Sequence, residues 1–357
     1  MKINPFPIAL LALICLITSC KKDAGPGPAP VSTYYYPPLT GDTWEKVKPE
    51  DLGWDIPKLN ETIEYIASNN SDALIILYKG RIVTEKYWNN FTAKSSAKIY
   101  SATKSMTAFM VGLAQEKGKL DVNKKVTDYL GAGWSNALPA REIQVTVKHL
   151  ITMTSGLDEN LTYEAAPATK WFYNTTAYHK VFEVLASALN QTNTAYSNDL
   201  LWSKIGMQNS FIATEPRFGG SGPTMSCSAR DMARFGLMIL SDGKWDGTAL
   251  MNDASYFEAM KSSSQALNPS YGYLWWLNGK SSYILPGTGP SVSGPLMPDA
   301  PTDLIAALGY ADKKIYVVKS RDLVVVRHGN ASNAPVTQAA SSFDNEIWKR
   351  LSLAIKP

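Results

Sequence analysis

The chain has 357 residues, of which 45% are hydrophobic and 18% are charged, and its formal net charge is +4. This is the composition of a globular protein, and it excludes disordered, collagen-like and disulfide-rich classes. Lys and Arg (35) nearly balance Asp and Glu (31), so binding driven by nucleic-acid phosphates is not expected. A chain of this length can bury a stable core without cross-links. We therefore predict one large domain with no nucleic-acid partner.

Cysteine and histidine are too few and too dispersed to suggest a metal site. Only Cys227 lies beyond the first twenty residues, so the body of the chain cannot form an internal disulfide. The three histidines are His149, His179 and His328, and they form neither a close pair nor an HExxH motif. We predict no metal ion and no cofactor.

The N-terminus has the features of an export signal. Lys2 precedes an apolar run at 7–17, which is too short to span a bilayer and fits the hydrophobic part of a signal peptide. Residues 17–20 read ITSC and resemble the lipobox of bacterial lipoproteins, in which the cysteine is acylated. The prediction is a signal peptide at 1–19 and a lipid anchor at Cys20. It implies attachment to a membrane of the bacterial cell envelope; a cleaved signal with an incidental cysteine is the alternative.

A Pro- and Gly-rich segment follows the predicted anchor. Residues 24–30 read AGPGPAP and favour neither helix nor strand, so they are typical of an extended tether. We predict a tether over 20–43 and a folded domain over 44–357, beginning near Trp44.

The folded body shows strand patterns at both ends and helical patterns between them. A helix is expected to start at Asp55, which can cap it ahead of Pro57. Hairpins are predicted at 73–87 and 315–326, and a final helix at 337–355. Strands joined by short turns predict an antiparallel sheet with N- and C-terminal helices packed on it. The predicted class is α/β (α+β), with a large helical lobe inserted.

Four Ser-x-x-Lys patterns occur, beginning at Ser19, Ser95, Ser101 and Ser241. Only Ser101 opens a run with apolar residues at helical spacing, which indicates a buried helix with Ser101 in its first turn. Residues i and i+3 share a helix face, so Lys104 would lie beside the Ser101 hydroxyl. Desolvation would lower the ammonium pKa of Lys104, and the amine could then accept the serine proton. The alternative is a capping serine with a solvated lysine.

Further segments resemble the β-lactamase-related, penicillin-recognising serine hydrolases. Residues 145–157 read VTVKHLITMTSGL, close to that family's ITxxHLLTHTSGL segment, and we interpret them as a short helix that ends at Gly156 with His149 packed or capping. Stretches at 225–236, 270–276 and 309–329 resemble later family segments in the same order. The resemblance spans about 45–350 and includes class C-like esterases and nylon-oligomer-hydrolase-like enzymes. It implies a β-lactamase/transpeptidase-like fold and a serine hydrolase.

The family's second motif, Tyr-x-Asn or Tyr-x-Ser, is best matched by Tyr173 and Thr175. The resemblance implies that Tyr173 relays a proton between Ser101, Lys104 and the leaving group, and that Thr175 holds substrate. The alternative is that Tyr173 is a core aromatic residue. Tyr178 is the other nearby candidate for the proton-relay role.

The third motif, Lys-Thr-Gly or His-x-Gly, departs from the family pattern. Residues 309–313 read GYADK, so Tyr310 replaces Lys or His and Asp312 replaces Gly. We expect Tyr310, Asp312 and Lys313 to line the substrate site, and Asp312 to crowd the groove beside the strand. The backbone N–H groups of Ser101 and Lys313 would form the oxyanion hole. Residues 287–289 are a weaker candidate because Pro290 follows them. No cation is left to bind a substrate carboxylate unless Lys313 or Lys314 serves.

Two functions follow from these patterns. The first is an exported serine hydrolase that cleaves a small ester, amide or peptide through an acyl-enzyme. The second is a catalytically silent envelope module that binds cell-wall or peptide ligands, favoured by the altered third motif. Trp275 and Trp276 are expected to face opposite sides of one strand, so at most one of them can line the site.

Overall fold

The computed structural model describes residues 1–2, 33–217, 220–287, 289–333 and 342–355. Residues 3–19 of the predicted signal peptide, Cys20 and the 24–30 tether segment lie outside these residues. Thr288 and the predicted start of the last helix at 337–341 lie outside them too. Across the described part of the chain, no helix combines the length and apolarity needed to cross a bilayer.

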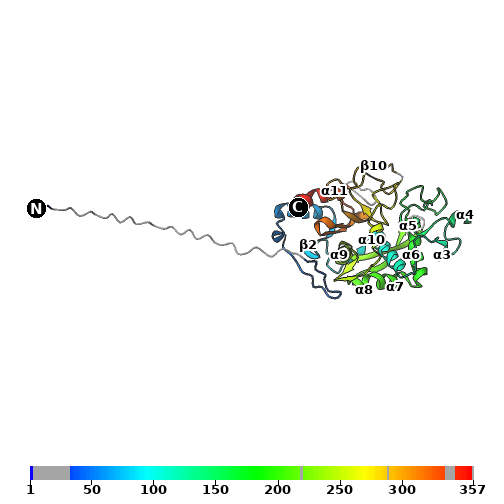
Figure 1. The fold of residues 1–357 in the computed structure, drawn as a ribbon, viewed down its shortest axis with the longest axis horizontal. Helices are drawn as coiled ribbons and strands as arrows, with labels where there is room; N and C mark the ends of the chain where they lie inside the picture. The colour runs from blue at the N-terminus through cyan, green and yellow to red at the C-terminus, as the bar shows by residue number, and fades with distance from the viewer. Residues whose placement is uncertain (3–32, 218–219, 288, 334–341, 356–357) are drawn as a thin grey trace. The chain divides into compact units, whose positions relative to one another are not determined.

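A six-stranded antiparallel sheet forms the centre of the folded body (Figure 1), in the order β2-β1-β13-β12-β11-β8. Within it, the β1–β13 pair joins opposite ends of the chain, from Ser71 opposite Gly329 to Tyr78 opposite Leu323. The strands of each predicted hairpin also pair antiparallel, β1 with β2 and β12 with β13, so the predicted sheet and both hairpins are confirmed. The strands are β1 (Ser71–Tyr78), β2 (Arg81–Tyr87), β8 (Trp276–Leu277), β11 (Ile305–Gly309), β12 (Lys313–Val318) and β13 (Leu323–Gly329).

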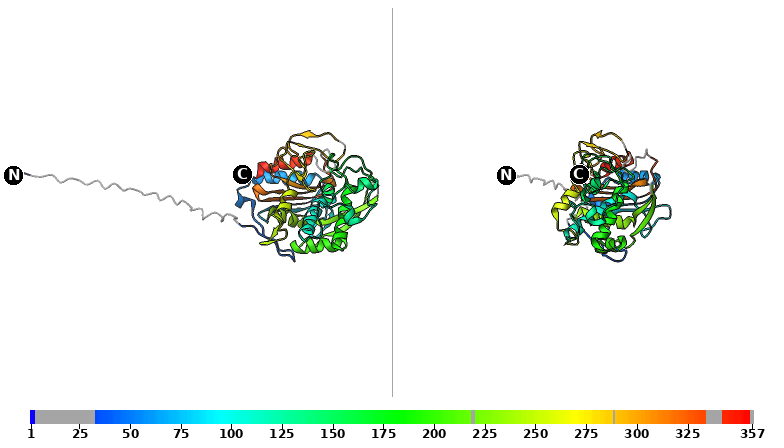
Figure 2. Two further views of the ribbon diagram at one scale, coloured as in Figure 1. Left: turned by 45° about the vertical axis from the view of Figure 1, so that its right-hand side comes forward. Right: turned by 90° about the vertical axis from the view of Figure 1, so that its right-hand side faces the viewer.

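Helices cover both faces of this sheet. On one face α1 (Ile56–Ser68) packs beside α11 (Ser342–Ala354), as Figure 2 shows, and the α11 residue Trp348 contacts Tyr316 of β12. On the other face α9 (Ala229–Leu240) packs on β12 and β13. Its Gly236 permits a close approach, because a Cβ there would lie 3.1 Å from Ile315 Cγ2. Ile315 and Tyr316 are neighbours in one strand, so they point to opposite faces.

The helical lobe follows β2 in sequence, and α2 (Thr103–Glu116) runs through its interior. Every residue from Thr103 to Ala114 is buried, because α2 contacts the β11 strand as well as the helices α6 and α10. The predicted buried helix is therefore confirmed, although it is enclosed on all sides rather than on one face. Its complete burial fixes its N-terminal turn firmly in place.

The remaining elements are the 15-residue helix α6, several shorter helices and small sheets of two or three strands. They are η1 (Pro49–Leu52), β3 (Ser96–Lys98), η2 (Tyr100–Ala102), α3 (Thr127–Leu130), α4 (Pro139–Glu142), α5 (Val147–Ile151), α6 (Thr175–Leu189), α7 (Asn193–Ser197), η3 (Asn198–Trp202), α8 (Ser203–Ile205), β4 (Phe211–Arg217), β5 (Gly220–Ser228), β6 (Lys244–Trp245), β7 (Thr248–Ala249), α10 (Ala254–Met260), β9 (Ser282–Tyr283), β10 (Val292–Ser293), η4 (Tyr310–Asp312) and η5 (Lys319–Arg321).

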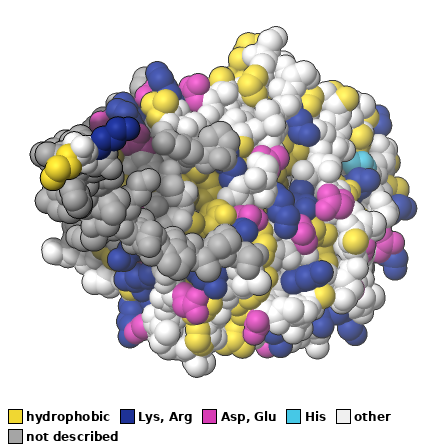
Figure 3. Space-filling model, turned by 60° about the vertical axis from the view of Figure 1, so that its left-hand side comes forward, with side chains coloured by type: hydrophobic (Ala, Val, Ile, Leu, Met, Phe, Trp, Pro, Cys, Tyr) yellow, Lys and Arg dark blue, Asp and Glu magenta, His cyan; other side chains and the backbone are white. Residues whose placement is uncertain are grey.

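Charged side chains of both signs share the surface. On the face drawn in Figure 3, Lys and Arg side chains lie among Asp and Glu side chains. Some pair directly, such as Arg81 with Glu45 at 2.9 Å and Lys170 with Glu164 at 2.6 Å. This mixing limits the electrostatic field that the visible, described part of the face can build up.

The packed body starts before Trp44, which corrects the expected tether over 20–43. The Tyr35 N–H donates to Lys79 O at 2.9 Å, and Arg81 Nη1 donates to Thr33 O at 2.8 Å. Arg234 Nη2 donates to Pro38 O at 2.8 Å. Carbonyl groups of this segment are thus bound by the body from Thr33 onward, which the Pro-rich composition did not reveal.

A glycine pair can test this packing. Gly80 and Gly53 both have positive φ, +81° and +69°, but a Cβ at Gly80 would collide with Tyr35 O whereas one at Gly53 would meet nothing within 4 Å. We expect Gly53→Ala to cost about 1–2 kcal/mol through backbone strain alone. Gly80→Ala should cost about 3 kcal/mol or more because overpacking adds to the strain. Urea unfolding measures both, and equal costs would contradict contact between the N-terminal segment and the body.

Candidate active site

Ser101 lies in a tight turn directly before α2. It belongs to the 3-10 turn η2, whereas α2 itself begins at Thr103. The preceding Tyr100 has φ +50°, an unusual conformation for an aromatic residue. The turn is tied to β5 by the Ile99 N–H, which donates to Met225 O at 2.9 Å. Ser101 remains partly exposed, so a substrate can reach a hydroxyl that is held by strained, well-anchored backbone.

The Lys104 amine lies beside the Ser101 hydroxyl. The side chain is 1% exposed, and its Nζ donates to Ser101 Oγ at 3.0 Å and to Thr175 Oγ1 at 3.3 Å. The same nitrogen lies 4.8 Å from the ring centroid of Tyr173 and 4.4 Å from that of Tyr178. A nitrogen at 3.0 Å from a serine oxygen is within reach of its proton.

Tyr173 and Tyr178 differ in how open their surroundings are. Tyr173 is half-buried, and its ring stacks on Trp276 with centroids 6.0 Å apart. Tyr178 is buried, and its hydroxyl shares a hydrogen bond of 2.9 Å with Thr107 Oγ1 in the interior. Of the two, Tyr173 has the placement expected of a group that meets substrate.

Residues 155–158, which include the SGL of the family-like segment, hold Tyr173 and Thr175 in place through Asn174. Asn174 lies between them and caps α6, accepting from the Ala177 N–H at 2.9 Å, while its Nδ2 donates to Leu157 O (2.9 Å) and Asp158 O (2.7 Å). Gly156 has φ +73°, and a Cβ there would collide with Ala165 O. This close contact and the positive φ explain why the motif has glycine at position 156, whose role is structural.

The short helix in this segment ends earlier than expected. The α5 helix spans Val147–Ile151 and stops five residues before Gly156, because Met153 takes a positive φ of 59°. His149 forms a capping box with Thr146: its Nδ1 accepts from the Thr146 N–H at 3.1 Å. The capping role proposed for His149 is thus confirmed, and burial lowers the pKa of its imidazole.

The third-motif residues form the tip of the β11–β12 hairpin, where Gly309 pairs with Lys313. A Cβ at Gly309 would collide with Ile99 O and lie 3.3 Å from Ala102 N, so the hairpin end lies against the Ser101 turn. Tyr310 is 57% exposed, and its ring meets that of Tyr100 edge-on at 5.5 Å. This places Tyr310 next to the residue that precedes the serine.

The side chain of Lys313 is only 5% exposed, although its backbone lies at the end of the hairpin. Its Nζ lies 5.9 Å from the ring centroid of Tyr100. Burial, together with the nearby Arg327 guanidinium, lowers the pKa of Lys313 to about 8. Lys313 therefore faces the same ring that Tyr310 contacts.

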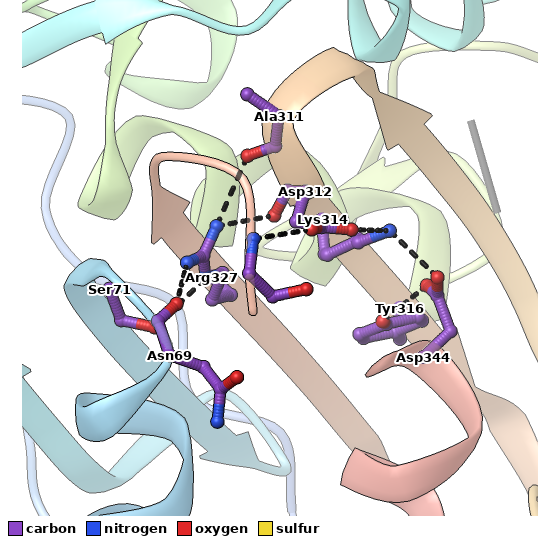
Figure 4. Close-up of polar contacts among 9 residues, drawn as sticks. Asn69, Ser71, Ala311, Asp312, Lys314, Tyr316, Arg327 and Asp344 are labelled. Atoms are coloured by element: carbon purple, nitrogen blue, oxygen red, sulfur yellow. Dashed lines mark hydrogen bonds and ion pairs between the residues drawn. The ribbon is translucent and has the colours of Figure 1, made fainter. Parts of the chain in front are cut away.

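Asp312 does not crowd the groove, which corrects our expectation. It is 3% exposed, its carboxylate lies 3.0 Å from Lys314 Nζ, and Figure 4 shows the pair beneath the hairpin. Lys314 also lies 2.8 Å from Asp344 Oδ2. A fully buried ammonium between two carboxylates is not placed to bind a substrate carboxylate, so Lys314 does not replace the missing cation.

An aromatic cluster packs against the ring of Tyr173. Trp276 stacks on it, and the buried Trp171 and Tyr271 lie 6.3 and 6.1 Å from its ring. Trp275 points the other way and stacks on Phe235 at 6.0 Å, so the expected opposite orientation of the two tryptophans is confirmed. Sequence reasoning missed Trp171 and Tyr271, because these residues meet only after distant segments fold together.

Comparison with known proteins shows the family and the fold to which the chain belongs. The model of the family described as "Beta-lactamase" matches residues 63–341. The chain belongs to the β-lactamase family. It is accordingly a serine hydrolase of that family, and the family resemblance of the motifs is confirmed.

One curated relative of this β-lactamase-family chain is the 6-aminohexanoate-dimer hydrolase of Paenarthrobacter ureafaciens, 22% identical over 287 residues, which cover 68% of this chain and 72% of the relative. Among solved structures, a Bacteroides dorei DSM 17855 protein described as a β-lactamase aligns with a TM-score of 0.66 at 15% identity, over 85% of this chain and 99% of that one. The octameric penicillin-binding protein homologue of Pyrococcus abyssi aligns with a TM-score of 0.60 at 17% identity, over 84% and 77%. These likenesses confirm the β-lactamase/transpeptidase-like fold.

Proposed function

We propose that the chain hydrolyses a small amide or ester through an acyl-enzyme on Ser101. The observation that carries this proposal is the 3.0 Å separation of Lys104 Nζ from Ser101 Oγ. In the first step the neutral Lys104 amine accepts the serine proton while Oγ bonds to the substrate carbonyl carbon. The resulting oxyanion is stabilised by the backbone N–H groups of Ser101 and Lys313.

The second half of the reaction releases both products. Tyr173 relays the proton that Lys104 took from Ser101 to the leaving nitrogen or oxygen, as the bond between that atom and the carbonyl carbon breaks, and Lys104 becomes neutral again. Water then attacks the acyl ester, gives a proton back through Lys104 to Ser101 Oγ, and leaves the free acid. Thr175, whose Oγ1 lies 3.3 Å from Lys104 Nζ, is placed to hold substrate next to these groups.

The substrate class is inferred from the hairpin end and from the curated relative. At the position where the family resemblance implies a cation, this chain has the exposed ring of Tyr310. A substrate without a carboxylate at this point suits that surface. The relative is named a hydrolase of a 6-aminohexanoate dimer, which supports a linear amide as one candidate substrate; a short ester is the other.

A fluorophosphonate probe tests the nucleophile. We expect the wild-type protein and Ser95→Ala to be labelled, and Ser101→Ala to remain unlabelled. Ser95 is the matched control because it begins another Ser-x-x-Lys pattern but accepts a hydrogen bond from the Thr92 N–H at 3.0 Å in a turn. Gel fluorescence measures labelling. If neither the wild type nor any variant is labelled, the silent binding module replaces the hydrolase.

A substrate panel tests the specificity. We expect purified residues 21–357 to hydrolyse 4-nitrophenyl acetate or the 6-aminohexanoate dimer at least tenfold more efficiently than a chromogenic cephalosporin, measured as kcat/KM. The physical reason is the missing cation at Tyr310. Efficient turnover of penicillins or the cephalosporin would contradict this specificity while leaving the serine mechanism intact.

Export and lipid attachment at Cys20 form part of the same proposal, based on the ITSC segment alone. We expect the full chain, expressed in a bacterium fed an alkyne-labelled fatty acid, to carry the label in its membrane fraction. Cys20→Ala should abolish the labelling, whereas Cys15→Ala, in the preceding apolar run, should not. Labelling that survives Cys20→Ala would rule out this anchor.

A further inference from the structure

We infer that Asp312 is a positioning residue, whose buried ion pair with Lys314 holds the β11–β12 turn in the shape that sets the Lys313 N–H beside Ser101. The inference rests on the proposed function, in which this N–H stabilises the oxyanion. It assigns Asp312 a task beneath the site rather than in the substrate groove.

The turn at the hairpin tip is strained. Ala311 and Asp312 are consecutive residues with φ of +56° and +59°, and neither is glycine. The left-handed conformation costs an ordinary residue about 1–2 kcal/mol. Two such residues in succession persist only where surrounding contacts determine their conformation.

Arg327 supplies one set of those contacts. Its Nη1 donates to Asp312 O at 3.0 Å and to Ala311 O at 3.2 Å. The rest of the guanidinium is fixed by Ser71 Oγ at 2.9 Å and Asn69 O at 2.7 Å (Figure 4). The carbonyl groups of the two strained residues are therefore bound by an arginine side chain that is itself anchored to β1 and to the end of α1.

The Asp312 carboxylate supplies the second set. One oxygen lies 3.0 Å from Lys314 Nζ, and the other accepts from the Ser332 N–H at 2.9 Å. Lys314 is anchored in turn to Asp344 of α11 at 2.8 Å, and the Tyr316 hydroxyl donates to the same carboxylate at 2.6 Å. Removing the Asp312 carboxylate would leave Lys314 paired with Asp344, but it would take away the acceptor of the Ser332 N–H and the side-chain contact between the turn and these buried charges.

The opposite side of the same turn lies against Ile99 and Tyr100, the two residues that precede the nucleophile. Gly309 packs against Ile99 O, and the Tyr310 ring contacts the Tyr100 ring at 5.5 Å. Lys313 directly follows Asp312 and pairs with Gly309. A change in the φ of Asp312 therefore turns the Lys313 N–H relative to Ser101, so the ion pair below the turn controls a donor above it.

Three variants test the inference. Asp312→Ala keeps the strain and loses the carboxylate, whereas Asp312→Gly loses the carboxylate but adopts positive φ without strain. Asp344→Asn is the matched control, because it removes a charge at the far end of Lys314 and leaves the Asp312–Lys314 pair in place. The readouts are kcat for 4-nitrophenyl acetate, normalised to the concentration of probe-labelled sites, the KM for the same substrate, and hydrogen exchange of the peptide covering 309–318.

We expect Asp312→Ala to lower kcat at least tenfold with KM changed less than threefold, since loss of one oxyanion donor costs about 10²–10³ in rate. Asp312→Gly should recover most of this loss, and Asp344→Asn should change kcat less than threefold. Exchange should accelerate in Asp312→Ala. Unchanged exchange in that variant, or a Gly variant as slow as Ala, would overturn the inference. An unlabelled wild type would instead contradict the proposed function, and the exchange result would still decide the inference.

Discussion

The proposed chemistry depends on one short contact, the 3.0 Å between the Lys104 amine and the Ser101 hydroxyl. The two groups are one turn apart in sequence, but their separation is maintained by burial. The α2 helix is enclosed from Thr103 to Ala114, so Lys104 has little freedom to move toward water. The strained Tyr100 and the β5 contact of Ile99 fix the serine from the other side.

Local sequence patterns were sufficient for those parts of the fold that depend on local rules. The apolar spacing after Ser101 indicated a buried helix, and the two hairpins indicated strands that pair in an antiparallel sheet. The Ser101–Lys104 contact was predictable for the same reason, because residues i and i+3 meet within one turn. Tyr173 and Thr175 needed the family resemblance, since no local rule brings residue 173 to Lys104.

The features that the sequence did not reveal depend on distant partners. Asp312 was expected to project into the groove, but its positive φ and the Lys314 ammonium draw its carboxylate beneath the hairpin. The Pro-rich start of the body was expected to be a tether, but hydrogen-bond donors of residues as distant as Arg234 bind its carbonyl groups. Neither outcome follows from spacing, because the turn that orients Asp312 is bound by Arg327 of β13, and Pro38 is bound by Arg234, 196 positions away.

The β11–β12 hairpin shows how a family site can accept unusual side chains. Tyr310 is exposed above the turn and Asp312 is buried below it. In the proposed mechanism Lys313, the next residue, contributes its backbone N–H. An oxyanion donor of this kind is a peptide N–H, so it depends on the course of the chain rather than on side-chain identity. Side chains at these positions are therefore free to change, provided that the turn keeps its shape. That condition links the exposed Tyr310, which is proposed to meet the substrate, to the buried charges of Asp312, Lys314 and the α11 residue Asp344.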